Sequence, residues 1–177
     1  MDTQTERNLV EAARSGCVES LGKLYERYYT SMVWVAYAIL LDRHLAEDAA
    51  QEAFAKACAR LAGLRRTDRF GTWLARICRN EARRVLRCRR RQAAARVPIE
   101  EEEVSPTVGS DGFDRAVKEA VEQLPFVYRE VVILHYYNDV GYERMHQVLG
   151  LSVDCVKGRL SRARKRIRKA LKRRGLD

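Results

Sequence analysis

The residues best suited to chemistry in this chain are basic, and they gather in two blocks. Residues 61–97 hold 12 arginines, no lysine and 2 acidic residues, while residues 154–177 hold 11 basic and 2 acidic residues. Arginine makes forked hydrogen bonds to phosphate and guanine, and it stacks on bases. A solvated helix face is the plainer explanation, but blocks this dense favour a polyanion, with nucleic acid ahead of a membrane surface.

Other reactive groups are too scattered to form a catalytic or metal site. His44, Asp48 and Glu52 are four residues apart and could line one helix face as metal ligands. A helix break is expected near His44, however, and no second ligand cluster follows it. No glycine-rich phosphate loop, GxSxG or HExxH motif occurs. We therefore expect no catalytic residue, no metal, no cofactor and no enzyme activity.

The cysteines and the apolar segments bear on location. Five scattered cysteines form no CxxC pair, and Cys78 and Cys88 would lie about 15 Å apart on one helix, too far to bridge. The most apolar stretch, residues 32–41, is too short to span a bilayer, and the N-terminus lacks the apolar core of a secretory signal. The sequence predicts a cytoplasmic protein with reduced thiols and no membrane insertion.

Composition and periodicity predict an all-α fold. Only 10 glycines and 3 prolines occur in 177 residues, which argues against a β-sandwich or barrel. Apolar residues at helical spacing run from Leu9 to Tyr28 and predict further helices over 31–41, 46–61 and 70–91. Residues 42–44 are expected to break the chain between the second and third of these helices.

An acidic segment divides the chain into two predicted domains. Residues 92–113 contain two of the three prolines and a run of four glutamates, which predicts a flexible, extended linker. The first domain is expected over 1–91 and the second over 114–177. The second domain is predicted to contain helices over 114–123, 125–137, 142–149 and 152–172.

The last two predicted helices have the layout of a helix-turn-helix. Gly150 is expected to end the first of them, and Ser152 to cap the second. Val156, Leu160 and Ala163 are expected to face the domain core, which leaves a basic face for the major groove of DNA. A helical hairpin with a solvated basic tail is the alternative.

Two stretches make the sequence resemble the extracytoplasmic-function, or group 4, sigma factors of bacterial RNA polymerase in the sigma-70 family. The first contains LYERYY, AEDAAQEAFAKA and FGTWLARICRNEARRVLRCRRR, and the second contains LPFVYREVVILHYY and VKGRLSRARKRIRKAL. The resemblance covers about 21–91 and 115–172. It implies a sigma2-like helical bundle and a sigma4-like helix-turn-helix domain, joined by the flexible acidic linker.

The resemblance also implies a function, which is to bind core RNA polymerase, direct it to −35/−10 promoter elements and help melt the DNA. Its polymerase contacts would be the β′ clamp helices and the β flap. The residues matching the clamp-binding helix are Asp48, Gln51 and Glu52. Their i, i+3, i+4 spacing gives one exposed polar face that could pair with basic helices, although a plain solvated face has the same pattern. An anti-sigma factor is a further possible partner.

The −10 element would be read by the arginine-rich block. The matching residues are Leu64, Arg65, Arg66, Phe70, Trp73, Arg76, Arg79, Asn80, Arg83, Arg84 and Arg87. The Asn80 amide would read a base edge, and the arginines would hold phosphates around a flipped base. Trp73 lies on the apolar stripe, so a core role competes with base stacking.

The −35 element would be read as duplex DNA by the last helix. The matching residues are Cys155, Lys157, Gly158, Arg159, Ser161 and Arg162. Four positions depart from the usual family pattern, namely Arg84, His146, Cys155 and Gly158, and these departures leave the promoter sequence open. His146 is expected either to loosen packing or to face solvent.

The main alternative is an operator-binding repressor or activator that uses the same helix-turn-helix. Such proteins usually dimerise to match a palindrome, and no dimerisation helix is evident here. The first basic block would also have no role in such a protein. A general nucleic-acid-binding protein is the third possibility. Binding to core polymerase distinguishes a sigma factor from both of these alternatives.

Overall fold

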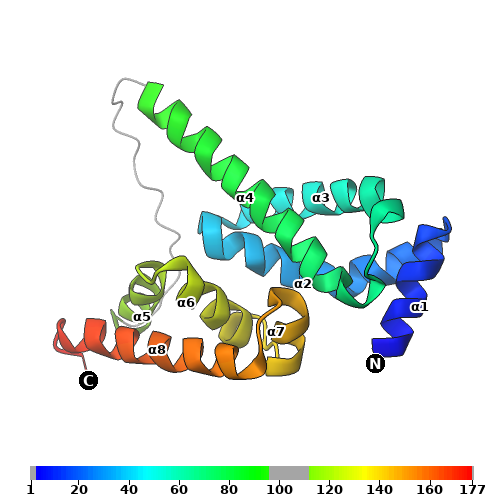
Figure 1. Ribbon diagram of the computed structural model, residues 1–177. Coiled ribbons are helices and arrows are strands. Elements are labelled where there is room, and N and C mark those ends of the chain that lie inside the picture. Colours follow the sequence, from blue (N-terminus) through cyan, green and yellow to red (C-terminus); the bar gives the residue numbers. More distant parts are fainter. Residues whose placement is uncertain (1–2, 96–111, 177) are drawn as a thin grey trace.

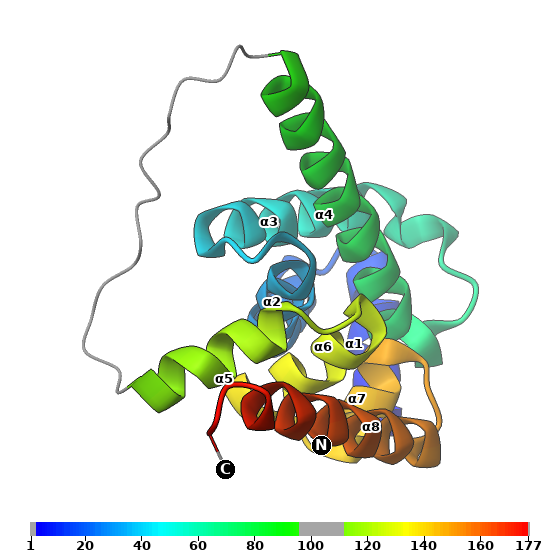
Figure 2. The same ribbon diagram turned by 90° about the vertical axis from the view of Figure 1, so that its left-hand side faces the viewer.

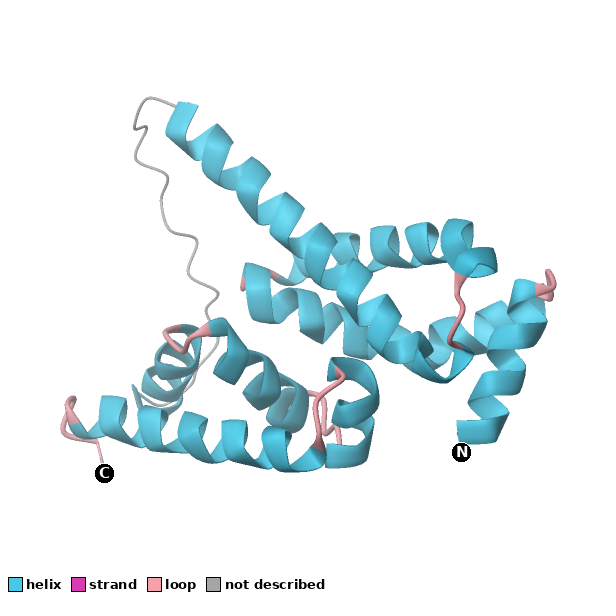
Figure 3. Ribbon diagram, in the orientation of Figure 1, coloured by secondary structure: helices cyan, strands magenta, loops and turns pink. Residues whose placement is uncertain are grey.

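The computed structural model describes residues 3–95 and 112–176, and all regular structure in these ranges is helical (Figures 1 and 3). The predicted all-α class is therefore confirmed. The ends of the predicted linker differ from expectation, because the arginine-rich helix continues to Ala95 and the next helix begins at Gly112. Residues 96–111, which carry the four-glutamate run, lie outside the described residues.

The first domain contains four helices: α1 (Thr3–Arg14), α2 (Val18–Leu40), α3 (Arg43–Arg60) and α4 (Phe70–Ala95). Two short 3₁₀ turns, Leu61–Gly63 and Thr67–Arg69, join α3 to α4. Helices α2, α3 and α4 pack on one another in pairs around a shared apolar core.

The prediction of separate helices before and after residues 29–30 is wrong, because α2 runs through without a break. No proline or glycine interrupts the segment after Gly22, and the buried stripe of Leu24, Tyr28, Met32 and Val35 keeps helical spacing throughout. The break expected at residues 42–44 is confirmed in part, since it lies at Leu41 and Asp42, while Arg43 and His44 already belong to α3. Leu41 takes a left-handed conformation, and the Asp42 carboxylate caps α3 by accepting a hydrogen bond from the Leu45 amide.

Tyr28 lies at the centre of the first domain, where α1, α2 and α4 meet. Its side chain is fully buried, its hydroxyl donates a 2.6 Å hydrogen bond to the Glu6 carboxylate, and its ring meets Phe70 edge to face. Gly71 lets α4 approach this ring, since a Cβ at position 71 would lie 2.6 Å from a Tyr28 ring carbon. Nearby, the buried Cys78 thiol donates to the Met32 carbonyl, and burial raises its pKa to about 12.

The second domain contains α5 (Gly112–Glu122), α6 (Phe126–Val132), α7 (Tyr142–Leu149) and α8 (Val153–Lys172). The helix expected over 125–137 begins one residue later, with Pro125 as its N-cap, and changes to a π-helical turn, η3 (Ile133–Tyr137). The expected turn at 138–141 is confirmed, and Asp139 adopts a positive φ there.

The two domains lie against each other. Helix α7 packs beside the N-terminal half of α4, while α6 and η3 pack on α2 (Figures 1 and 2). The buried apolar side chains of both domains form one continuous cluster. The domains that carry the two basic helices, α4 and α8, are therefore joined by one apolar core.

We predict that Gly71→Ala lowers the free energy of unfolding by about 1–3 kcal/mol, because the added methyl overpacks against Tyr28. Gly22→Ala is the matched control. A Cβ at this exposed site in α2 meets nothing within 4 Å, so the change should raise the free energy of unfolding by roughly 0.5–1 kcal/mol. Urea denaturation measures both effects, and an equal response of the two variants would contradict the packing described here.

Candidate nucleic-acid interface

Helices α7 and α8 form the predicted helix-turn-helix. Gly150 ends α7 with a left-handed φ of 68°, and the Ser152 hydroxyl accepts a hydrogen bond from the Cys155 amide at the start of α8. The predicted register is confirmed, because Val156, Leu160 and Ala163 are buried. The helix therefore turns its opposite face, and its basic side chains, outward.

Five of the six residues predicted to contact the −35 element share the outward side of α8. Lys157, Ser161 and Arg162 are exposed, while Cys155, Gly158 and Arg159 are half-buried. Gly158 leaves the helix surface open next to Arg162, whose guanidinium would lie 4.0 Å from a Cβ at position 158. Arg159 is the exception, since its charge acts electrostatically on the buried Glu130 of α6.

His146 faces solvent, which is one of its two expected outcomes. Its ring Nδ1 lies 2.7 Å from the Leu151 carbonyl, so the side chain bridges the turn between α7 and α8. This contact ties the two helices at the point where a small residue is usual in the resembled family.

Aromatic rings beneath the basic side chains are the functional residues that sequence reasoning missed. The Lys157 ammonium lies 5.7 Å from the centre of the Tyr142 ring, which stacks on His135. The Arg164 guanidinium donates a 2.8 Å hydrogen bond to the Tyr136 hydroxyl. Cation–π and hydrogen-bond contacts of this kind restrict long basic side chains. The signal available in the sequence was the HYY run, three aromatic residues directly before a turn.

Helix α4 carries the predicted −10 residues on more than one face. Arg76, Asn80, Arg83, Arg84 and Arg87 are exposed, as are Arg65 and Arg66 in the preceding loop. Leu64 and Phe70 are buried in the core of the first domain, and Trp73 is half-buried with its ring 5.9 Å from Phe70. These three apolar residues therefore support the loop and the helix in this arrangement, whereas the polar ones face outward.

Arg79 differs from its neighbours because its guanidinium is paired across the domain boundary. Its Nε donates a 2.7 Å hydrogen bond to the Glu130 carboxylate of α6, and Glu130 is only 3% exposed. Burial raises the pKa of Glu130, while the nearby Arg79, Arg159 and Arg83 guanidinium groups act to lower it. Sequence reasoning missed Glu130, because nothing local marks a helical glutamate as buried.

The three residues predicted to bind polymerase lie together on α3. Asp48, Gln51 and Glu52 are all exposed at i, i+3 and i+4 spacing, on the side opposite Ala46, Ala49, Ala50 and Ala53. Glu52 pairs with Lys56 at 3.1 Å, while Asp48 and Gln51 are exposed beside it. The surface is a compact acidic and polar patch on one helix.

A chain of charges links this patch to α4. Lys56 bridges Glu52 and Glu81 of α4, and Glu81 in turn pairs with Arg84 at 2.9 Å. Burial acts to raise the pKa of Glu81, but hydrogen bonds from Lys56 and Arg84 outweigh it, and the pKa lies below its ordinary value. The ionised carboxylate therefore holds α3 and α4 together.

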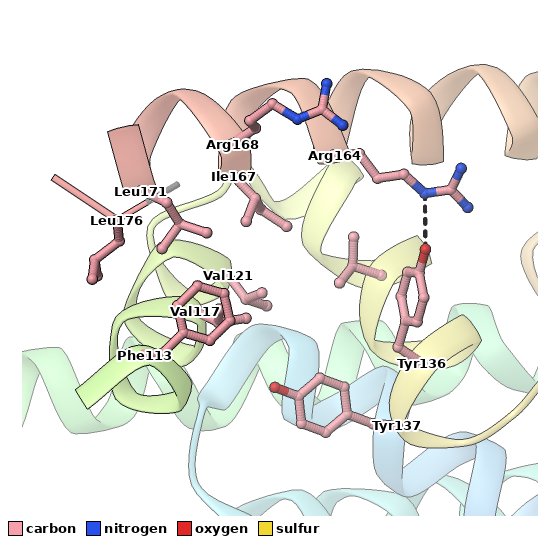
Figure 4. A pocket seen from close by; sticks show the side chains of 11 residues that line it. Phe113, Val117, Val121, Tyr136, Tyr137, Arg164, Ile167, Arg168, Leu171 and Leu176 are labelled. Atoms are coloured by element: carbon pink, nitrogen blue, oxygen red, sulfur yellow. Dashed lines mark hydrogen bonds between the residues drawn. The ribbon is translucent and has the colours of Figure 1, made fainter. Parts of the chain in front are cut away.

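An apolar groove of about 510 Å³ opens between α5, η3 and α8 (Figure 4). Phe113, Val117 and Val121 line one side and Ile167 and Leu171 the other, as Figure 4 shows. Tyr136, Tyr137 and Arg164 stand at its edge, with the Arg164–Tyr136 hydrogen bond drawn as a dashed line. The groove could accept an apolar segment of a partner, and sequence reasoning missed it.

Within residues 3–95 and 112–176, no group of three or more histidine, cysteine or acidic side chains is placed to hold a metal ion. None of the helices described in these ranges is both long and apolar enough to cross a membrane.

These features define a class of protein: a two-domain helical DNA-binding factor with a helix-turn-helix in one domain and an arginine-faced helix in the other. Family models identify it further. Sigma-70 region 2 matches residues 24–92, and sigma-70, region 4 matches residues 114–167. The chain belongs to the sigma-70 family of RNA polymerase sigma factors, in its extracytoplasmic-function group. Its function is therefore that of a transcription initiation factor acting with RNA polymerase at promoters.

Curated relatives agree with this assignment. The probable RNA polymerase sigma factor RfaY of Xanthomonas campestris is 33% identical over 97% of this chain, which spans 45% of that protein's length. The RNA polymerase sigma-H factor of Pseudomonas aeruginosa is 30% identical over 95% of this chain and 94% of its own length.

Solved structures of sigma factors are also similar. CnrH in complex with the cytosolic domain of CnrY aligns with a TM-score of 0.64 and 26% identity over 97% of this chain and 98% of that one. The sigma factor RpoE in complex with the anti-sigma factor NepR, from Bartonella quintana, aligns with a TM-score of 0.58 and 27% identity, over 85% of this chain and 96% of that one.

We predict that Glu81→Gln lowers the free energy of unfolding by about 1–2 kcal/mol at pH 7, because it weakens two charge-assisted hydrogen bonds. Since the pKa of Glu81 is lowered by folding, its contribution is present above the ordinary value of 4.5 and is lost as the pH falls through the lowered pKa. Chemical denaturation of the parent protein and of Glu81→Gln from pH 7 to pH 3 measures this loss.

The matched control is Glu26→Gln, which neutralises an exposed carboxylate on α2 and should change the free energy of unfolding by less than about 0.5 kcal/mol. A Glu81→Gln deficit that stayed constant down to pH 3 would contradict the role given to the ionised carboxylate.

Proposed function

We propose that the surfaces of this sigma factor divide its work among three helices. Helix α8 reads the −35 element as duplex, α4 with its preceding loop reads and holds the melted −10 strand, and α3 binds the core polymerase. The single observation that carries this proposal is the outward face of α8, which is fixed by a capped turn and a buried apolar stripe.

The −35 role follows from the geometry of the helix-turn-helix. An α-helix fits the major groove of B-DNA, and side chains on its outer face reach base edges and phosphates. Arg162, Ser161 and Lys157 have the exposure for these contacts. Cys155 lacks the alcohol donor that is usual at its position, so the base preference at that point is expected to differ from that of typical family members.

The −10 role rests on the exposed polar side of α4. Holding a single strand requires cationic side chains along the backbone and one group that can read a base edge. Arg76, Arg83 and Arg87 supply the charge, and the exposed Asn80 amide lies among them. Because Trp73 is half-buried against Phe70, we assign it to supporting the helix in this arrangement.

The polymerase contact is proposed for Asp48, Gln51 and Glu52 on α3, facing the clamp helices of the β′ subunit. The apolar groove between α5, η3 and α8 is the candidate surface for the β flap. An anti-sigma factor is a further proposed partner, since RpoE, one of the similar structures, is bound by the anti-sigma factor NepR. We place the protein in the cytoplasm, where it acts without catalytic activity of its own.

The domain limits proposed for these roles are residues 1–91 for core binding and −10 recognition and 114–177 for −35 recognition. The acidic segment 92–113 connects the two and is proposed to thread the RNA exit path, where its carboxylates imitate an RNA backbone. Helix α4 extends four residues beyond the first of these limits.

We predict that Arg162→Ala weakens binding of the core–sigma complex to a duplex −35 element by about 5- to 100-fold, because it removes a groove contact worth roughly 1–3 kcal/mol. Affinity for core polymerase should stay unchanged. The matched control is Arg173→Ala, which removes the same charge at the exposed C-terminal end of α8. Electrophoretic mobility shift and core pull-down assays measure the two affinities, and equal loss of both in Arg162→Ala would contradict the division of labour.

We predict that the double substitution Asp48→Ala and Glu52→Ala reduces core polymerase capture at least 10-fold, because it removes the negative charges that pair with a basic partner surface. Fluorescence anisotropy with fluorescent core enzyme measures the affinity. The matched control is Glu11→Ala with Glu26→Ala, two exposed carboxylates on α1 and α2. Similar capture of core polymerase by the two double variants would show that the α3 patch does not bind the polymerase.

A further inference from the structure

We propose that Lys157 and Arg164 form a pair of phosphate-binding side chains on one flank of α8. Three aromatic rings, those of His135, Tyr136 and Tyr142, position this pair for the backbone of duplex DNA. The inference rests on the proposed role of α8 as the reader of duplex DNA and extends it. It adds Arg164 to the residues that contact DNA, and it makes the three rings positioning residues.

Arg164 lies on a side of α8 that the proposed −35 contacts already occupy. Lys157, Ser161 and Arg164 follow one another at i, i+4 and i+7, so their side chains project from one face of the helix. All three side chains are exposed. Two helical turns, or about 10 Å along the axis, separate Lys157 from Arg164. The pair can therefore reach different phosphates of one bound duplex.

The contact with Tyr136 orients Arg164 through a single nitrogen atom. Its Nε donates a 2.8 Å hydrogen bond to the Tyr136 hydroxyl, and the guanidinium carbon lies 5.8 Å from the centre of the same ring. Figure 4 shows the two terminal nitrogens of Arg164 pointing away from the apolar groove. A phosphate can accept two parallel hydrogen bonds from such a pair of nitrogens. Nε then holds the group to the protein while the terminal nitrogens meet the ligand.

Tyr142 acts on both members of the pair. The Lys157 ammonium lies 5.7 Å from the centre of the Tyr142 ring, which is a cation–π contact. The hydrogen bond to Tyr136 raises the pKa of Arg164, and a contact with the Tyr142 hydroxyl acts in the same direction. The half-buried ring of Tyr142 therefore lies next to both cations and restricts both of them.

The three rings are connected beneath the pair. His135 stacks on Tyr142 with the ring centres 5.3 Å apart, and it meets Tyr136 edge to face at 4.8 Å. Its Nδ1 lies 3.3 Å from the Val140 carbonyl, which ties the rings to the turn before α7. A basic side chain that is already ordered loses less conformational entropy when it binds a ligand. The rings therefore favour phosphate binding without touching the phosphate.

The contacts of this pair involve neutral groups, which sets it apart from other paired basic residues of the protein. Arg79, for example, is matched by the buried carboxylate of Glu130. A ring or a hydroxyl restricts a cation without cancelling its charge, so Lys157 and Arg164 keep their positive charges for a ligand. Two ordered cations on the outer side of a DNA-reading helix suit the phosphates that flank the groove.

The first test removes the proposed phosphate contact. The parent protein, in complex with core polymerase, selects a duplex from a random-sequence library, and its affinity is then measured at several salt concentrations. We expect Arg164→Ala to bind this duplex about 5- to 10-fold more weakly at about 0.1 M salt, because one phosphate contact is lost. The slope of log K against log salt should also fall by about 1.

The matched control is Arg173→Ala, at the exposed C-terminal end of α8, and it should keep the affinity and the salt slope of the parent. Phosphate ethylation interference locates the contact. At least one phosphate whose ethylation weakens binding by the parent and by Arg173→Ala should have no such effect on Arg164→Ala.

The second test separates positioning from a structural role. Tyr136→Phe removes only the hydroxyl that holds Arg164, so we expect about 2- to 5-fold weaker binding with an unchanged salt slope. In the Arg164→Ala background the same change should have no further effect, because the two residues act through one contact. Tyr137→Phe is the control, since it removes a neighbouring hydroxyl from a ring that lies against Trp34, and it should bind like the parent.

The outcomes separate this inference from the function on which it rests. Parental affinity and salt slope in Arg164→Ala, with weakened binding by Arg162→Ala, would overturn the phosphate-binding pair and leave the reading role of α8 intact. Parental binding by both variants would overturn the role of α8 itself. An equal loss from Tyr136→Phe in both backgrounds, or tighter binding by Tyr136→Phe alone, would overturn the positioning role of the rings.

Discussion

The crowding of positive charge on two helices is the constraint on which this structure depends. Residues 61–97 carry 12 arginines, and folding packs α4 against α7, the helix that precedes the similarly basic α8. Several of these basic residues have a nearby compensating group. Glu81 serves Lys56 and Arg84, Glu130 serves Arg79, and the rings of Phe126 and Tyr136 lie against Arg83 and Arg164. Arg76, Arg87 and Arg162 are exposed, and they are among the charges proposed to meet DNA.

Local sequence patterns predicted much of the fold. The register of α8 was predictable because an apolar stripe with one N-cap admits a single rotation of the helix, and Gly150 ends α7 where a left-handed residue is required. The break expected near residue 30 does not exist, because the polar residues Thr30 and Ser31 lie within one continuous helix. Ser31 is buried in the continuous helix, where it accepts a hydrogen bond from Asn138 of the second domain.

The contacts between helices that are distant in sequence could not be predicted from local patterns. Glu130 looked like any helical glutamate, and only the meeting of α6 with α4 makes it a buried partner of Arg79. The apolar groove likewise needs Phe113 and Leu171, far apart in sequence, to face one another across it. Helix α1 lies outside both family-model matches, yet its Glu6 is buried between Tyr28 and Arg144 and helps to join the domains.

The order of the helices along the chain has a consequence during synthesis. Helix α4 ends at Ala95, while α7, which covers part of it, is completed at Leu149, some fifty residues later. At a ribosomal rate of about 5–20 residues per second, the side of α4 that later packs on α7 stays uncovered for roughly 3–10 s. Until α7 is made, the apolar and the arginine-bearing sides of α4 are therefore both open to solvent, so the half-made chain offers more sticky surface than the finished one.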